Sequence, residues 1–284
     1  MIEPVLAGTA LAREIRTTVP DPGSVAVWRL GQSGVVLRFA GSTVLIDPYL
    51  SNHCEAVLDA PFDHRRLTRS PLDPVEIDMI DLIVCSHDHL DHLDPPTIRT
   101  LARQNPRARI AAPGPSAATL RGLGWESNRI LLFDDGFDIR VGHLRVESFA
   151  VPHDDFDEGP DGHPYLGWIV SEGGVRVAHL GDARDHGRIR AALRGEPVDL
   201  LLVPINGRSP HRSAMGFAGN MSPLEAVRLA QDCHVRVTVP MHYDMFAQNV
   251  DEGALDDFAA AAAASGIESI ALPVGGLHIV SSGR

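Results

Sequence analysis

Short apolar segments separated by glycine, proline and aspartate begin at Ser24 and predict strands joined by tight turns. In the first third of the chain we expect these strands at Val25–Leu30, Gly34–Phe39, Thr43–Ile46 and Asp81–Cys85. Charged residues and several prolines fill the segment Ser51–Asp78, which predicts a long surface loop able to border a cleft.

After the fourth strand, helical and extended patterns alternate. Further strands are predicted at Arg109–Ala112, Ile130–Phe133, Phe137–Val141, Leu144–Phe149, Leu166–Ser171, Val175–His179, Leu200–Val203 and Val235–Val239. Helices are predicted at Pro95–Gln104, Pro115–Leu123, Arg184–Arg194, Pro223–Cys233 and Leu255–Ala264.

Two sets of mainly antiparallel strands, each accompanied by helices, indicate two mixed sheets packed face to face with the helices outside. We therefore predict an α+β fold, an αββα sandwich. Because no low-complexity linker or short repeat interrupts the pattern, residues 1–284 are expected to form a single domain. A chain of 284 residues, 44% of them hydrophobic, has enough apolar material for a sizeable core.

Charge and composition narrow the possible partners. The net charge of -12 repels phosphate backbones and anionic membranes, so we expect neither nucleic acid nor a membrane as a partner. The basic residues are all arginine, which excludes lysine nucleophiles. The 3 cysteines form no CxxC pair, and the N-terminus lacks the features of a signal peptide. With no apolar run long enough to span a membrane, these features favour a cytoplasmic protein.

The densest group of candidate metal ligands follows the predicted strand Asp81–Cys85. His87 and His89 are two positions apart, so in an extended segment both rings can point the same way, and Asp91 and His92 follow within one turn. Imidazole and carboxylate groups suit Zn, Mn and Fe, and so many in one short segment exceed what packing requires. The sequence therefore predicts a metal site here.

Three later residues each stand just beyond the end of a predicted apolar strand: His153, Asp182 and His242. In a sandwich, strand ends share an edge where side chains from distant segments converge. One metal ion needs three or four protein ligands, so these residues are the candidates to complete a site that the first cluster begins.

The HxHxDH motif, followed by His, Asp and His at strand ends, resembles that of the metallo-β-lactamase superfamily. The resemblance covers nearly the whole chain. It implies that His87, His89 and His153 hold one metal ion, that Asp91, His92 and His242 hold the second, and that Asp182 bridges both. It also implies that Asp47, which follows an early strand, orients a ligand by hydrogen bonding.

Within that superfamily, the chain resembles the L-ascorbate-6-phosphate lactonase branch. The segments Trp28–Gly34, Ile80–His89 and Pro240–Asp244 carry this likeness, whereas Pro204–Arg208 departs from it. The fold and metal ions implied by the resemblance carry over to this chain better than the sugar-acid substrate does.

Two divalent ions, Zn or Mn ahead of Fe, can share a water molecule and lower its pKa from 15.7 toward about 7. We expect the resulting hydroxide to attack a lactone or related ester, such as a phosphorylated sugar lactone, with Asp91 and Asp182 as catalytic residues. The chain has no G-x-S-x-G motif and no catalytic cysteine context, which disfavours a covalent route.

Substrate contacts are expected from Asn206, Arg208 and Arg212, with Tyr243 beside His242. The arginines could clamp an anionic small molecule, although a solvated basic loop on an acidic protein is the alternative. Among the other histidines, we expect four at the surface, namely His53, His64, His143 and His278. Four more, His163, His179, His186 and His211, neighbour the candidate sites and receive no role.

Several alternatives stay open. A phosphodiesterase or an amide hydrolase could use the same fold, and a metal-binding regulatory protein without turnover would share the ligands. Diiron oxygen-reducing relatives carry H-x-E-x-D-H, in which a carboxylate replaces His89, and RNA-processing relatives add a large inserted domain and a basic face. A homo-oligomer is compatible with the sequence, but no apolar stripe identifies an interface.

Overall fold

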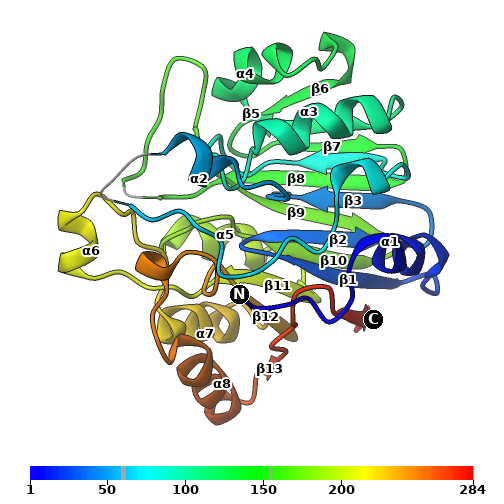
Figure 1. Cartoon of the computed structure of the whole chain (residues 1–284). Coiled ribbons are helices and arrows are strands. Elements are labelled where there is room, and N and C mark those ends of the chain that lie inside the picture. Colours follow the sequence, from blue (N-terminus) through cyan, green and yellow to red (C-terminus); the bar gives the residue numbers. More distant parts are fainter. Residues whose placement is uncertain (59–61, 154, 284) are drawn as a thin grey trace.

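Two 7-stranded sheets pack face to face in the computed structural model, which describes residues 1–58, 62–153 and 155–283 (Figure 1). The first sheet has the order β14 (Leu277–Ser281), β1 (Ser24–Gly31), β2 (Gly34–Arg38), β3 (Thr43–Ile46), β4 (Leu82–Val84), β5 (Arg109–Pro113) and β6 (Ile130–Phe133). The second has the order β13 (Glu268–Ser269), β12 (Val237–Met241), β11 (Leu200–Pro204), β10 (Val175–His179), β9 (Leu166–Glu172), β8 (Leu144–Ala150) and β7 (Asp138–Val141).

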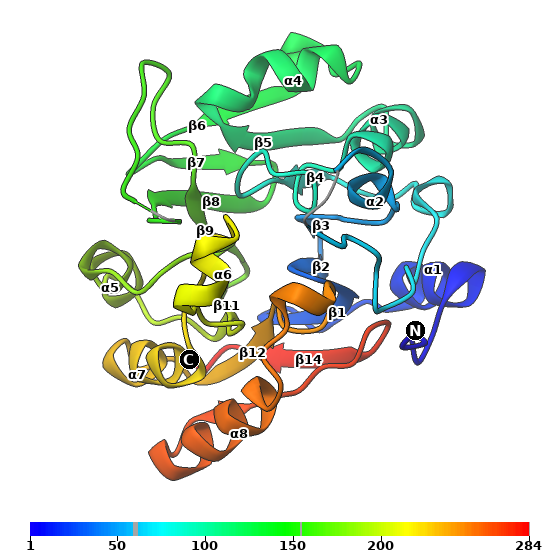
Figure 2. The same ribbon diagram turned by 60° about the vertical axis from the view of Figure 1, so that its left-hand side comes forward.

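Helices cover the outer face of each sheet, which confirms the predicted αββα arrangement (Figure 1). The helices α1 (Gly8–Thr17), α3 (Pro95–Gln104) and α4 (Ala117–Gly122) pack on the first sheet. The helices α5 (Gly187–Arg194), α7 (Pro223–Asp232) and α8 (Ala254–Ser265) pack on the second. Two short helices, α2 (His53–Val57) and α6 (Pro210–Ala214), lie in the loops at one side of the sandwich (Figures 1 and 2).

In each sheet, half of the strand pairs are antiparallel and half are parallel. The expectation of mainly antiparallel strands is therefore wrong for β3 to β6 and for β10 to β13. In the first sheet the pairing changes from antiparallel to parallel at β3, and in the second it changes at β10. The reason is the connections: strands joined through a crossover such as α5 or α7 return in the same direction, whereas hairpins reverse it.

Several element boundaries differ from the sequence expectation. Strand β12 begins at Val237 and runs to Met241, so His242 follows it directly. Helix α5 begins at Gly187 because the ring of His186 caps it, accepting a hydrogen bond from the Arg188 amide. The pattern also did not predict α1 or the edge strand β14, whose burial is intermittent because one side of each is open to solvent.

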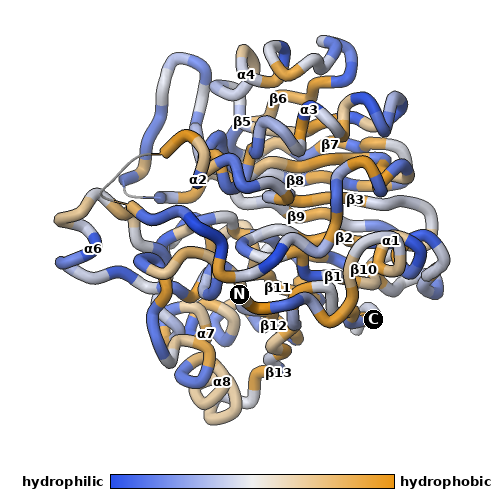
Figure 3. Tube along the Cα trace, in the orientation of Figure 1, coloured by the Kyte–Doolittle hydropathy of each residue, from blue (hydrophilic) through white to orange (hydrophobic). Residues whose placement is uncertain are grey.

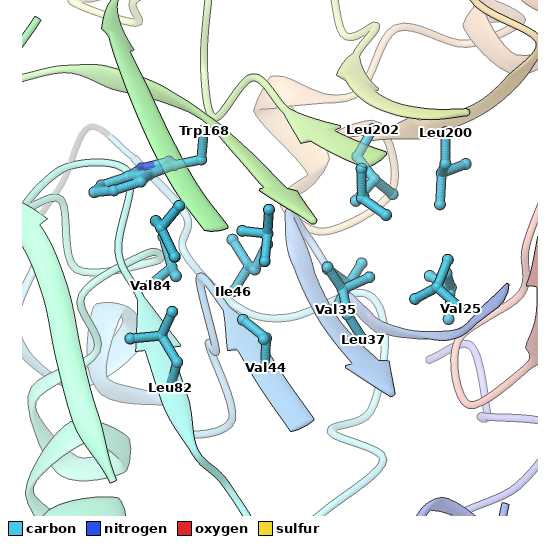
Figure 4. Close-up of a cluster of buried hydrophobic side chains, with 14 of the residues drawn as sticks. Val25, Val35, Leu37, Val44, Ile46, Leu82, Val84, Trp168, Leu200 and Leu202 are labelled. Atoms are coloured by element: carbon cyan, nitrogen blue, oxygen red, sulfur yellow. The ribbon is translucent and has the colours of Figure 1, made fainter. Parts of the chain in front are cut away.

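The core between the sheets is built by alternate residues of the strands (Figure 4). In β1, Val25 and Val27 face the opposite sheet, whereas Ala26 and Trp28 face the helices. Because side chains alternate across a strand and both faces of β1 are buried, its sequence is apolar almost throughout. Figure 3 shows the same contrast, with hydrophobic residues along the strands and hydrophilic ones in the outer loops.

Strand ends from both sheets meet at one edge of the sandwich. The segments that follow β4, β8, β10 and β12 carry the candidate ligands predicted from the sequence, and the turn between β1 and β2 approaches them. Among the helices of the described residues, none has the length and apolar character needed to cross a membrane.

Candidate metal centre

The HxHxDH segment forms a compact turn directly after β4. The His92 and Leu93 amides both donate to the His89 carbonyl, at 3.0 and 2.8 Å, so the backbone curls instead of continuing the strand. The rings nevertheless converge, with centroids 4.5 Å apart for His87 and His89 and 4.0 Å for His87 and His92. The expectation of an extended segment is wrong, and it is the turn that brings these rings together.

His153, Asp182 and His242 join this cluster from three other strand ends. One Asp182 oxygen lies 3.0 Å from His242 Nε2 and 3.6 Å from His153 Nε2. The other Asp182 oxygen lies 3.2 Å from His92 Nε2. Asp182 therefore stands between two groups of histidines.

The ligand atoms fall into groups whose members all lie within 4.8 Å of one another. One group is His87, His89 and His153; another is Asp91, His92 and His242; the third joins His87 and His92 to Asp182. The first two groups are the ligand sets that the family resemblance implies, and Asp182, for which it implies a bridging role, lies within 4.8 Å of a ligand atom from each of them, on His87 and on His92.

Unpartnered buried atoms show that these residues fit a bound cation. Among the described residues, His87 Nε2 and His153 Nε2 have no hydrogen-bond partner, and the 3.2 Å contact between His92 Nε2 and Asp182 Oδ1 lacks hydrogen-bond geometry. An unsatisfied buried polar atom costs about 1–3 kcal/mol, so several in one cluster call for a common partner. Nitrogen and carboxylate oxygen donors together suit Zn, Mn or Fe.

Burial and neighbouring charges set the protonation of the cluster. Burial lowers the pKa of His153 to about 4 and that of His87 well below its usual value, which favours the neutral imidazole that binds metals. Burial also opposes charge at His242, but the nearby Asp182 and Asp91 carboxylates raise its pKa to about 9. Acidic groups thus carry negative charge into a buried centre, where a cation is the natural counter-charge.

Asp47, for which the resemblance implies a role in orienting a ligand, makes a hydrogen bond with His92. Its Oδ2 accepts a hydrogen bond from His92 Nδ1 at 2.8 Å, and a carboxylate can only accept, so Nε2 of that ring is left facing the cluster. Asp47 also accepts from the Ser86 amide at 2.7 Å and the Ser86 hydroxyl at 2.6 Å. The same hydroxyl lies 2.9 Å from His87 Nδ1, so a single carboxylate organises ligands from both groups.

Two residues without a predicted role also support the centre. Gln32 Nε2 donates to Asp91 Oδ2 at 2.7 Å, and the Gln32 carbonyl accepts from the His242 amide at 3.1 Å. His179 is fully buried, and its Nε2 donates to the Ser33 carbonyl at 2.8 Å. The sequence signal for Gln32 and Ser33 was a polar pair between two glycines in an otherwise apolar hairpin.

The turn that presents Asp182 requires glycine at position 181. Gly181 has a φ of +53°, and a Cβ there would lie 2.8 Å from the Ser86 side chain. Its amide donates to Nδ1 of His179 at 3.2 Å, which ties the turn to the strand before it. The left-handed backbone and the close approach to Ser86 both favour glycine.

A cleft of about 430 Å³ opens above the centre, and His89, Asp91, His153, Asp182 and His242 form its floor. Its walls come from α2 and the residues after it, from the segment after α6, and from residues 246 and 249. A substrate in this cleft would contact the candidate ligands directly.

The predicted substrate contacts do not line this cleft. Arg208 makes a bidentate ion pair with Glu225, at 2.6 and 2.8 Å, and also donates to the Asn220 carbonyl. Asn206 and Arg212 both donate to Asn249 Oδ1, at 2.9 and 3.4 Å, and reach the cleft only through that residue.

Tyr243, the fourth predicted contact, lies under the Arg29 guanidinium, 4.7 Å from the ring centroid. Arg29 in turn pairs with Asp244 at 2.5 Å. Tyr243 therefore packs into a buried ion-pair cluster and is not among the residues that line the cleft.

Of the remaining histidines, one lines the cleft and others lie away from it. His64, expected at the surface, is half-buried in the cleft wall, because the loop that carries it folds against Phe246. His163 pairs with Asp134 at 2.6 Å, and His211 is exposed on α6. The sequence could not separate these roles, since each depends on a distant partner.

Comparison with known proteins agrees with this geometry. The family model described as a β-lactamase superfamily domain matches residues 42–243. The UPF0173 protein PYRAB01190 of Pyrococcus abyssi is 28% identical over 227 residues, covering 80% of this chain and 87% of that protein. The probable L-ascorbate-6-phosphate lactonase UlaG of Salmonella heidelberg is 23% identical over 271 residues, covering 84% and 75%.

A solved structure supports the fold independently. Igni18, a metallo hydrolase of Ignicoccus hospitalis, matches with a TM-score of 0.67 at 19% identity, covering 90% of this chain and 98% of its own. The strand order, the HxHxDH turn and the family match all agree: this chain belongs to the metallo-β-lactamase superfamily of metal-dependent hydrolases.

Proposed function

We propose that this protein is a hydrolase with two metal ions that opens lactones or related esters. The observation that carries the proposal is the pair of ligand groups with Asp182 between them. The likeness to a probable lactonase over most of both chains supports an ester carbonyl as the target.

His87, His89 and His153 would hold one ion and Asp91, His92 and His242 the other, with Asp182 shared. When bound, such ions activate water at neutral pH and polarise a carbonyl oxygen. Zn and Mn both fit the donor set. The hydrogen bond that Asp47 accepts from His92 and the one that Gln32 donates to Asp91 hold these two side chains in place before any ion or substrate arrives.

Asp91 is the residue placed to move protons. Its carboxylate lines the cleft, and 17% of the side chain is exposed, so it faces both the centre and the substrate space. From this position Asp91 can accept the proton of the attacking water and pass it to the leaving alkoxide. Gln32 Nε2 fixes one carboxylate oxygen for this task.

Metal analysis together with a lactonase assay tests the proposal. The protein expressed in Zn- or Mn-supplemented medium should hold about two ions per chain and open simple lactones. The H87A/H89A double variant should lose at least one ion and nearly all activity. A His143→Ala variant, changed at an exposed residue, is the matched control. Full metal binding by the double variant would overturn the proposal.

A further inference from the structure

The cleft wall beyond the metal ligands is mainly apolar. Phe62 and Phe217 pack with their ring centroids 4.2 Å apart and their planes tilted by 55°, and they come from the loop after α2 and the segment after α6. Leu58, Leu90 and Phe246 extend the same wall. Leu58 is 39% exposed, so the wall presents apolar surface to water that a bound molecule would cover.

Aromatic rings continue around the cleft. The ring of His64 lies 5.9 Å from Phe62 and 5.3 Å from Phe246, both in edge-on geometry. Ring contacts therefore link Phe217, Phe62, His64 and Phe246 in series along the cleft. Such a surface favours a flat or alkyl group through burial of apolar area and through ring contacts.

Outside the candidate metal ligands, the described lining of the cleft offers no lysine or arginine to pair with an anionic group. The chain has no lysine, and no arginine is among the described residues that line the cleft. Of the carboxylates in this lining, Asp91 and Asp182 are candidate metal ligands, and Asp88 is the one outside the ligand groups. Arg208 is already paired with Glu225, so it is not available as a phosphate clamp.

One neutral polar group at the wall is Asn249. Its Oδ1 accepts from Asn206 and Arg212, which leaves its Nδ2 as the donor that it can offer to a ligand. A neutral amide donor suits a carbonyl or ring oxygen, and it lacks the charge that compensates a buried phosphate.

We propose that the substrate is an uncharged lactone or ester with an aryl or medium-length alkyl group, and that this group packs against Phe62, Phe217 and Phe246. This inference rests on the proposed function. It replaces the anionic substrate that Arg208 and Arg212 suggested, because these arginines donate to Glu225 and Asn249 and do not line the cleft.

The test compares matched substrates on the metal-loaded protein: γ-butyrolactone, its phenyl and pentyl derivatives, and 6-phosphogluconolactone. We expect kcat/KM for the phenyl or pentyl lactone to exceed that for γ-butyrolactone about tenfold and that for the phosphorylated lactone about a hundredfold. Phe217→Ala should raise KM for the phenyl lactone about tenfold and leave γ-butyrolactone within about twofold. Phe217→Leu should recover part of the loss, and Phe137→Ala, at an exposed phenylalanine elsewhere, should change neither.

Failure of this inference is distinct from failure of the lactonase proposal. A preference for 6-phosphogluconolactone would keep the lactonase and overturn the apolar substrate, as would equal effects of Phe217→Ala on all substrates. If no lactone is opened, calorimetry can still measure the binding of 2-pentylcyclopentanone and of 6-phosphogluconate, and this comparison decides whether the site prefers an apolar or a phosphorylated ligand. Binding of the ketone that Phe217→Ala weakens supports the apolar site, and tighter binding of the phosphate compound overturns it.

Discussion

At the scale of single residues, the hydrogen bond between Asp47 and His92 holds the His92 ring with Nε2 facing the cluster, and we expect it to raise the affinity of the centre for a cation. Asp47→Asn replaces one acceptor oxygen by an NH₂ group, although the site receives donors from Ser86 and His92. We expect the affinity for Zn or Mn to fall about 10–100-fold, as for other residues that orient a metal ligand.

Competition with a chelating dye measures this change in affinity. Asp256→Asn, at an exposed position on α8, is the control and should bind metal as the unchanged protein does. Equal affinities for the two variants would show that Asp47 does not orient a ligand.

The ion pair between Arg208 and Glu225 predicts an acid-dependent contribution to stability. Hydrogen bonding to Arg208 lowers the pKa of Glu225 from its usual 4.5 to about 2. A depressed carboxyl pKa stabilises the folded state above the unfolded value, and this contribution is lost as pH falls through the folded value. The advantage of the unchanged protein over Glu225→Gln should therefore be constant near neutral pH and shrink between about pH 5 and pH 2.

Thermal unfolding at several pH values checks this, with Glu252→Gln at an exposed site as the control. A difference in Tm between the unchanged protein and Glu225→Gln that stays the same down to pH 2 would contradict it.

Single residues also show where sequence reasoning succeeds and where it stops. The candidate ligands could be predicted because each follows an apolar strand, and strand ends share an edge of the sandwich. The role of Arg208 could not, because its partner Glu225 lies on a different element and the sequence does not show which side chains meet. Gln32 and His179 were missed for the same reason: their functions lie in contacts with residues far along the chain.

At the scale of elements, β9 joins the two sheets through Trp168. This side chain is fully buried between the sheets (Figure 4). Its ring meets that of Phe133 edge-on, with the centroids 4.9 Å apart. Trp168→Ala should lower the free energy of unfolding by about 3–5 kcal/mol, since it removes a large buried ring and leaves a cavity. Phe137→Ala, at a phenylalanine 43% exposed, should cost much less. Urea unfolding measures both, and similar losses would show that the inter-sheet core is not where we place it.

Helices and strands with clear apolar runs or start signals could be predicted from the sequence. Whether neighbouring strands pair parallel or antiparallel was harder to predict. Strands such as β2 and β3 follow from apolar runs between glycines, and α7 follows from Ser222 and Pro223 at its start. The parallel pairing of β10, β11 and β12 depends on where helices cross over, which a local pattern does not contain.

At the scale of the whole molecule, the candidate metal ligands and the cleft lie at one edge of the sandwich. The protein carries a net charge of -12, and carboxylates also line its cleft, so the metal-free centre attracts cations. The same edge gathers the ends of strands from both sheets, and it is there that ligands from separate parts of the chain meet.

The central claim is that these ligands form two metal sites that share Asp182. Anomalous diffraction from crystals of the Zn-loaded protein tests it most directly. We expect one peak among His87, His89 and His153 and a second among Asp91, His92 and His242, with Asp182 contacting both. A single peak, or peaks outside these groups, would contradict the claim.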